Sequence, residues 1–225
     1  MVFEHPKIKE LLDNTRVLWA LHHAQSVMSW DSETYMPREG VRDRSLAMAE
    51  LAALYQKLLL RDEVVKPVEE LLDNEDLNDY ERGVVRVLHR SIKIMKALPP
   101  KLVMEIAKTT EEARPYWKEA RDKNKFELFE PYLDKIIKLV IEAADYIGYE
   151  EHRYDALLDR YEEGLTKARV EEMFNYIEPR IRRVLDRVLS EGRYPQSHEL
   201  EEVKYEVKAM ERVNKTILEK LGIPV

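Results

Sequence analysis

The segment YDALLDRYEEG, residues 154–164, has acidic residues at a spacing that carboxylate chemistry can use. Asp155, Asp159 and one of the two glutamates that follow are three or four residues apart, so one helix can present them on one face. Three clustered carboxylates can hold a cation or shift one another's pKa values. A solvated face on which Arg153 or Arg160 pairs with the acids is far more common, and we favour that interpretation.

The histidines are the other candidates for metal or proton chemistry: His5, His22, His23, His89, His152 and His198. A helical zinc protease would carry H-E-x-x-H, and no histidine of this sequence begins that motif. The fourth residue after His198 is Glu202, and we expect a solvated helix start there rather than a metal site. His22 and His23 point about 100° apart on a helix. We therefore expect His22 to be a core or interhelix histidine with one hydrogen-bond partner, rather than a metal ligand or an acid-base group.

Other catalytic arrangements are missing from the sequence. No serine has a readable triad, and no two glycines stand close enough for a phosphate-binding loop. The three tryptophans, Trp19, Trp30 and Trp117, sit at helical spacings and are predicted to be core residues rather than part of a ligand site. From its residues alone, the chain shows no complete catalytic site.

The stretch WDSETYMPREG is interpreted as a corner between two helices. Pro37 pushes Met36 out of the α region, and a proline and a glycine bracket the turn. Asp31, or the serine after it, can bond free backbone groups at the helix end. Trp30 and Tyr35 are expected to clamp the two helices together.

Nearly the whole chain has the apolar spacing of amphipathic helices, as at Val170, Phe174, Ile177 and Ile181. We find no alternating strand and no Asn-Gly hairpin signal. The sequence predicts an all-α fold with a single domain over residues 1–225. Its eight or nine helices are expected at residues 5–30, 41–60, 62–73, 79–97, 100–122, 126–147, 151–163, 167–191 and 197–221.

The composition limits the class of protein. Charged residues make up 36% of the chain with both signs interspersed and a net charge of −7, which argues against a nucleic-acid surface. The absence of cysteine excludes disulfides and thiolate metal sites. No apolar run is long enough to span a membrane, and the first residues lack the pattern of a signal peptide, so we predict a cytoplasmic protein. Abundant Lys, Arg and Glu without cysteine are typical of hyperthermophile proteins.

Four segments carry recognisable motifs: HAQSVMSWDSETYMPREG, FELFEPYLDKIIKL, YDALLDRYEEGLT and ERVNKTILEKLGIPV. In order and spacing they resemble the N-terminal part of the carboxypeptidase Taq family of metallocarboxypeptidases, with Tyr132 where a tryptophan is common. We interpret the matching motif positions as structural. They are Trp30, Asp31, Thr34, Met36, Pro37, Tyr154, Asp155, Asp159, Tyr161, Glu162 and Gly164.

The resemblance implies a helical, zincin-like, homodimeric enzyme that removes single residues from peptide C-termini. Members of the family use zinc or cobalt, bound by the histidines of H-E-x-x-H and a later glutamate, and the motif glutamate is the general base. They run to roughly 500 residues, or about three average domains. These metal and base residues lie beyond the segments matched here, so we assign no catalytic residue, metal ligand or cofactor to this chain. We expect it to be inactive alone.

Several alternatives stay open. The chain can be a fragment of a longer enzyme, one product of an interrupted gene, or a short protein with its own role. It can also be a helical interaction or dimerisation module, standing alone or docking a separately encoded catalytic half. A different enzyme that uses the Asp155 face is the least favoured alternative. The expected partners are a second copy or a catalytic half, with a peptide substrate only in a full-length enzyme, in whose groove Asp31 or Glu33 can lie.

Overall fold

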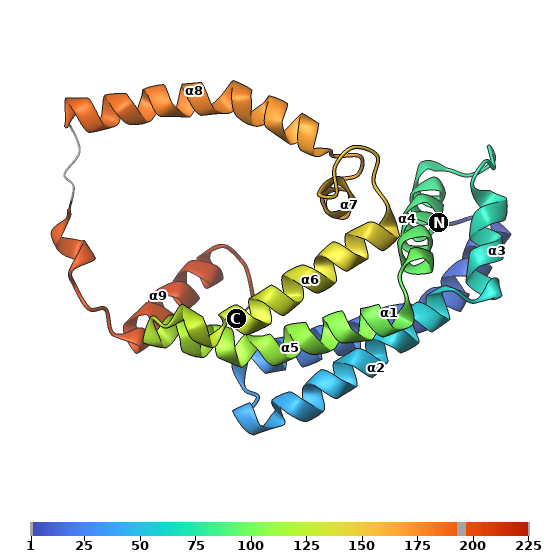
Figure 1. Ribbon diagram of the computed structural model, residues 1–225, viewed down its shortest axis with the longest axis horizontal. Helices are drawn as coiled ribbons and strands as arrows, with labels where there is room; N and C mark the ends of the chain where they lie inside the picture. The colour runs from blue at the N-terminus through green and yellow to red at the C-terminus, as the bar shows by residue number, and fades with distance from the viewer. Residues whose placement is uncertain (1, 193–196, 225) are drawn as a thin grey trace. The chain divides into compact units, whose positions relative to one another are not determined.

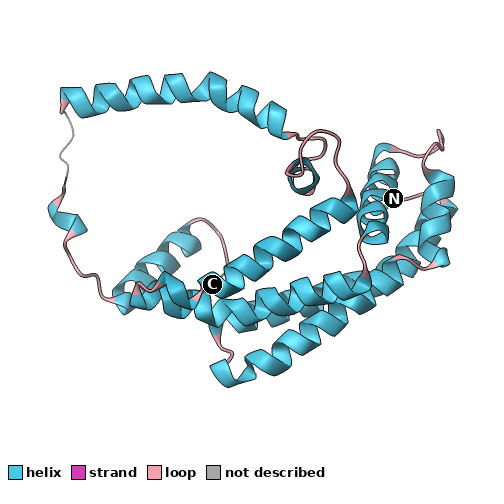
Figure 2. Ribbon diagram, viewed as in Figure 1, coloured by secondary structure: helices cyan, strands magenta, loops and turns pink. Residues whose placement is uncertain are grey.

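The computed structural model describes residues 2–192 and 197–224. Over these residues it contains nine α-helices, three short 3-10 helices and no β-strand (Figures 1 and 2), so the predicted all-α fold is confirmed. The chain divides into two compact units, the first ending at Lys167 and the second beginning at Ala168. The single domain over the whole sequence stays a prediction.

The first unit is a group of helices joined by short turns (Figure 1). Its main helices are α1 (Pro6–Thr34), α2 (Val41–Leu59), α3 (Asp62–Leu71), α4 (Asp79–Ala97), α5 (Pro100–Lys123), α6 (Glu130–Ile147) and the single turn α7 (Asp155–Leu158). Two 3-10 turns, η1 (Arg38–Gly40) and η2 (Phe126–Leu128), lie before α2 and α6. Helix α2 packs along α5, α5 packs along α6, and α1 contacts both α2 and α3.

Two apolar clusters form the core of the first unit. The larger lies among α1, α2, α3 and α4 and includes Ile8, Leu11, Leu59 and Val64, which are fully buried. The smaller lies around Leu102, where α5 meets α6. Each fully buried side chain of this size contributes about 1.5–3 kcal/mol relative to an exposed one.

Helix α4 begins with a capping box. The Asn78 side chain accepts hydrogen bonds from the first turn, and Glu81 reaches back to the Asn78 N–H at 3.0 Å. The other carboxylate oxygen of Glu81 accepts from the N–H groups of Glu4 and His5 at 2.7 and 2.8 Å. These backbone bonds, led by those of His5 and Asn78, lower the pKa of Glu81. One buried carboxylate thus caps α4 and fixes the N-terminal segment.

The pair Pro99–Pro100 separates α4 from α5. Proline has no N–H, so Pro99 cannot donate to the Met95 carbonyl as a helical residue would. The buried Gln56 of α2 supplies the missing donor, and its Nε2 bonds the carbonyls of Met95 and Leu98 at 2.8 and 2.7 Å. A residue far along the chain therefore completes this helix end.

The second unit contains most of α8 (Lys167–Glu191), the turn η3 (Glu199–Glu201) and α9 (Val207–Lys220). None of its described residues is buried. Over residues 2–192 and 197–224, no helix is long and apolar enough to cross a membrane.

Two predicted helices differ most from the structure in extent. The one at residues 151–163 is reduced to the single turn α7, because side chains there bond backbone groups in competition with a helix. The one at residues 197–221 begins only at Val207; before it, His198 caps a separate turn by accepting the Leu200 N–H at 3.1 Å. Residues 193–196, just before that predicted helix, lie outside the described residues.

Candidate functional site

The corner between α1 and α2 is held by Arg44. Its Nη2 donates to Asp31 Oδ2 at 2.5 Å, and its Nη1 donates to Ser32 Oγ at 3.0 Å and to the carbonyl oxygen of Met28. The side chains of Arg44 and Asp31 are only 18% and 35% exposed, so solvent screens their pairing incompletely. The contact ties the end of α1 to α2.

Helix α1 runs four residues past its predicted end. The Thr34 hydroxyl donates to the Trp30 carbonyl at 2.7 Å, and the N–H groups of Tyr35 and Met36 both donate to the Asp31 carbonyl, where the helix ends. Gly40 packs against Met36, and an added Cβ at position 40 would lie 3.3 Å from Met36 Cγ, so the methionine side chain would have to shift slightly. The corner therefore consists of residues 35–40, closed by backbone bonds and the packing of Met36.

The predicted aromatic clamp and tryptophan core are wrong. Trp30 and Tyr35 are 57% and 76% exposed and contact each other edge to face, with ring centroids 5.4 Å apart. Trp19 and Trp117 are 68% and 50% exposed, and His22 is exposed as well. Helical spacing identified the face on which each residue lies, but it carried no information on whether another element covers that face.

A cavity of about 890 Å³ lies beside the corner, between the end of α1 and the second half of α5. Glu33 lines it, whereas Asp31 is not among its lining residues. The other lining residues are Ser32, Thr34, Met36, Arg38, Val41, Glu111, Arg114, Pro115, Trp117, Lys118, Glu119, Arg121, Asp122 and Lys123.

Charges of both signs are paired across this cavity. Glu111 is 3% exposed, and its Oε2 lies 3.3 Å from Nε of Arg114, which also pairs with Glu33. Arg38 pairs with Glu119 at 2.7 Å; together with Lys123, it lowers the pKa of Glu119. The hydroxyls of the lining Ser32 and Thr34 donate to backbone carbonyls. The residues around the cavity can therefore form a polar surface. Neither of these two hydroxyls donates to a side chain that could act as a general base.

Tyr132 joins the corner to α6. Its ring stacks on that of Tyr116 with centroids 4.3 Å apart, and the guanidinium carbon of Arg38 lies 5.4 Å from the Tyr116 centroid. Burial, followed by the hydrogen bond with Tyr116, raises the pKa of Tyr132 to about 12. The phenol therefore stays protonated at neutral pH and serves packing rather than proton transfer.

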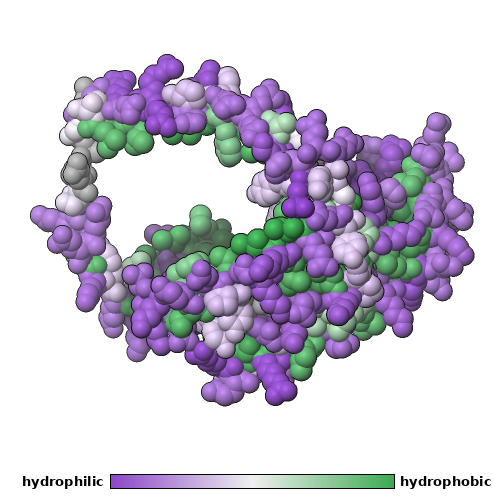
Figure 3. All heavy atoms as spheres, viewed as in Figure 1, coloured by the Kyte–Doolittle hydropathy of each residue, from purple (hydrophilic) through white to green (hydrophobic). Residues whose placement is uncertain are grey.

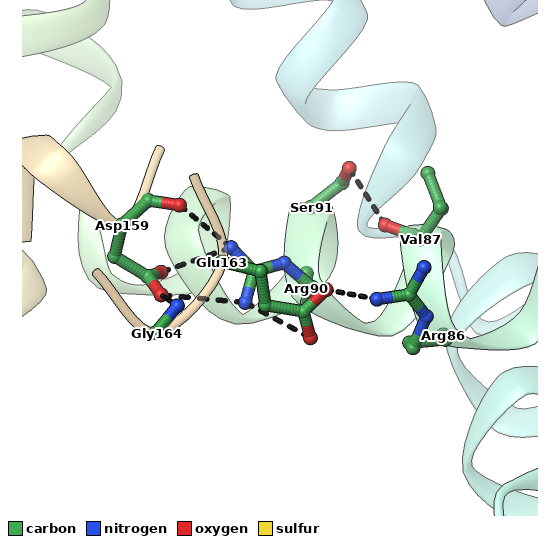
Figure 4. A network of polar contacts seen from close by, with 7 residues as sticks. All are labelled: Arg86, Val87, Arg90, Ser91, Asp159, Glu163 and Gly164. Atoms are coloured by element: carbon green, nitrogen blue, oxygen red, sulfur yellow. Dashed lines mark hydrogen bonds and ion pairs between the residues drawn. The ribbon is translucent and has the colours of Figure 1, made fainter. Parts of the chain in front are cut away.

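The acidic segment 154–164 is bound to α4 (Figure 4). Asp159 Oδ1 accepts the Gly164 N–H at 2.8 Å. Nη2 of Arg90 donates to Asp159 Oδ2 at 3.0 Å and to the Asp159 carbonyl at 2.8 Å. The Gly164 N–H, and then Arg90, lower the pKa of Asp159. This carboxylate therefore stays ionised and closes a loop.

The other acids of the segment also have structural partners. Glu163 pairs with Arg86 and lies 3.3 Å from Arg90 (Figure 4), so the expected pairing with Arg153 or Arg160 is wrong. Asp155 accepts the N–H groups of His152 and Lys167 at 3.1 and 2.7 Å.

Asp155, Asp159 and Glu163 do not lie together on one helix face, because α7 ends at Leu158 and each carboxylate has its own partners. Tyr154 and Tyr161 are 51% and 89% exposed, and Glu162 is exposed too. The structural interpretation of the matched motif positions stays a prediction, and these contacts are consistent with it.

The described residues do not fit a metal site. Over residues 2–192 and 197–224, no three His, Cys, Asp or Glu side chains gather closely enough to hold an ion. His152 and His198 each use Nδ1 to accept a backbone N–H at 3.1 Å, from Tyr154 and Leu200. We therefore derive no chemical step through a metal bound by this chain.

Three organising residues were missed from the sequence: Arg44, Arg90 and Glu111. Arg44 and Arg90 bind partners 13 and 69 positions away, so no local spacing marks them among many exposed arginines. No local signal marks Glu111, because it lies on the face of α5 opposite the buried Leu102 and Thr109.

Comparisons with known proteins match this chain to one family of carboxypeptidases. The sequence profile of the carboxypeptidase Taq (M32) metallopeptidases matches residues 10–224. Thermostable carboxypeptidase 1 of Pyrococcus furiosus is 51% identical over 224 residues, which is 100% of this chain and 45% of that protein. Carboxypeptidase 1 of Bacillus subtilis is 28% identical over 192 residues, covering 85% of this chain and 38% of the relative. The chain thus spans less than half the length of these curated relatives.

Solved structures show the same helical arrangement. A structure of Pyrococcus furiosus carboxypeptidase matches 100% of this chain and 45% of its own, with a TM-score of 0.85 and 51% identity. Metallocarboxypeptidase 1 of Trypanosoma cruzi matches 95% of this chain and 43% of its own, with a TM-score of 0.71 and 27% identity.

Proposed function

Because this chain belongs to the carboxypeptidase Taq (M32) metallopeptidase family, we propose that it is the N-terminal helical region of a metal-dependent carboxypeptidase. In this proposal the whole enzyme removes C-terminal residues from peptides in the cytoplasm. Zinc or cobalt is bound by polypeptide outside the matched region, where it activates water. The match over residues 10–224, with less than half of each relative covered, carries the proposal.

The residues of this chain have a positioning role in the proposal. Arg44 fixes the end of α1, and the Glu33–Arg114–Glu111 pairs hold that end beside α5. Arg90 holds the acidic segment against α4. These contacts shape a rigid wall with a polar cavity; they do not by themselves provide a nucleophile and its base.

A peptide assay tests the predicted inactivity. We expect no release of C-terminal residues from the purified chain, with or without added zinc or cobalt. Steady metal-dependent release by the chain would refute this part of the proposal. The native polypeptide in source cells should be about twice the 26.7 kDa of this chain, since the chain covers 45% of the P. furiosus relative. An antibody against the chain, together with intact mass, gives that size.

A helical interaction module is the second candidate. The observation that favours it is the second unit, where large apolar residues of α8 and α9 are exposed, including Phe174, Val184, Val207 and Leu221 at 64%, 64%, 71% and 69%. In this case the native size is 26.7 kDa, and the chain associates with a second copy or a separate catalytic half. Light scattering that finds a strict monomer at all concentrations counts against a homodimer.

A further inference from the structure

Helix α8 carries a continuous apolar line along one face, here called the seam. The seam consists of Val170, Phe174, Ile177, Ile181, Val184 and Val188. The steps between them are four, three, four, three and four residues, the alternation of the a and d positions of a heptad, which is the pattern of helices that pack along one another. At about 1.5 Å per residue, the seam is roughly 27 Å long.

The seam is exposed. Phe174, Ile181 and Val184 are 64%, 60% and 64% exposed, and Ile177 and Val188 are 38% and 43% exposed. Figure 3 shows hydrophobic side chains gathered along one face of α8. Within the second unit, α9 does not pack along α8. Since amphipathic helices derive most of their stability from packing of the apolar face, this arrangement indicates a missing partner.

The face of α8 opposite the seam carries its irregular and polar features. Pro179 lies there, and its missing N–H interrupts the helix ladder on the side away from the seam. Tyr176 is on the same side, with the guanidinium of Arg180 3.6 Å from its ring centroid. The irregular and polar features of α8 therefore leave the seam itself uninterrupted.

We propose that the seam docks a helix from the polypeptide that forms the rest of the longer relatives; this inference rests on the proposed function. The P. furiosus structure matches this whole chain, α8 included, and more than half of that protein has no counterpart here. That unmatched length can supply the occupant of the seam. The alternating four- and three-residue spacing selects a helix with its own apolar repeat rather than an extended peptide. The occupant is thus a helix of the catalytic half.

A binding experiment between two purified polypeptides tests the seam. The probe is the part of P. furiosus thermostable carboxypeptidase 1 that this chain does not match, produced separately. Size exclusion with light scattering and titration calorimetry measure its association with the chain. The double variant I177S/I181S places hydroxyls on the seam. The control Y176S removes a 63% exposed aromatic ring from the opposite face.

The proposal expects a one-to-one complex with the original chain and with Y176S. It expects at least a hundredfold weaker binding by I177S/I181S, because central apolar contacts dominate such interfaces. Circular dichroism checks that helix content is kept. Should the double variant lose helix, V184S, which changes one 64% exposed residue, must show at least a fivefold loss.

Equal binding by the seam variants and the original chain would overturn the proposal, as would no binding by the original chain. Self-association abolished by I177S/I181S and unaffected by the probe would assign the seam to a second copy instead. Cobalt-dependent peptide cleavage by the complex is read separately. A complex that needs the seam but is inactive upholds docking and contradicts the proposed function. A complex that cleaves peptides but forms equally well with the seam variants supports the proposed function and contradicts docking at the seam.

Discussion

The two units share one sequence pattern and differ in what that pattern achieves. In the first unit, apolar stripes meet one another, and every buried residue of the described chain lies there, between Ile8 and Ala156. In the second unit, α8 has an equally regular stripe, and none of the described residues is buried. An amphipathic repeat therefore specifies a helix in both units, but it produces a core only where a second face is supplied.

The charged residues differ in the same way. In the first unit, ion pairs such as Arg44–Asp31 and Arg90–Asp159 join different elements of the fold. In the second unit, pairs such as Arg182–Glu178 lie one turn apart on the same helix. The former fix tertiary geometry, whereas the latter support only local helix.

The strongest test of the contrast compares one apolar truncation in each unit. Leu11→Ala removes a fully buried side chain and should lower the free energy of unfolding by about 2–5 kcal/mol. Ile181→Ala, at 60% exposure, should change it by less than about 0.5 kcal/mol. Urea unfolding followed by circular dichroism measures both. A large loss at Ile181 would show that the seam is covered within this chain.

The second test concerns the corner. Arg44→Ala removes three hydrogen bonds at the end of α1 and should lower the free energy of unfolding by about 1–3 kcal/mol. Arg42→Ala, on the same helix but exposed, is the matched control and should be nearly neutral. Thermal unfolding compares the two variants. Equal losses would contradict the role assigned to Arg44.

The third test uses pH on the buried capping carboxylate. The pKa of Glu81 is lowered in the folded state, so its contribution to stability is present above its unfolded pKa of about 4.3. That contribution is lost as pH falls through the lower folded value. Glu81→Gln should have a lower melting temperature than the original protein at pH 7, and this difference should disappear in acid. Glu10→Gln, at an exposed position, is the control and should melt at the same temperature as the original protein. A difference in melting temperature for Glu81→Gln that persists in acid would refute the role of the carboxylate.

The smallest expected effect is on the local pairs of α8. Arg182→Ala breaks a solvent-exposed pair with Glu178 and should change the free energy of unfolding by less than about 0.5 kcal/mol. Added salt should remove even that difference. A loss above about 1 kcal/mol would mean that the pair is shielded from solvent and that the two units are more alike than described.

Much of the fold could be predicted because helix signals are local. The limits of α4 and α8, Asp79–Ala97 and Lys167–Glu191, match the predicted ranges. The segment 151–163 could not be predicted, because Asp159 prefers a backbone N–H and Arg90 to a continued helix. A competition of this kind depends on a partner 69 residues away.

The sequence by itself determined the all-α class, most helix limits and the resemblance to the family. Periodicity, caps and motifs depend on residues that are close together in the sequence, so they can be recognised without the structure. Only the tertiary structure decided which faces are covered. It exposed Trp19 and Trp30, buried Glu81 and Glu111, and assigned Arg44 and Arg90 their partners. The physical reason is that spacing defines the polarity of a face, while burial and ion pairing depend on what approaches that face from elsewhere in the chain.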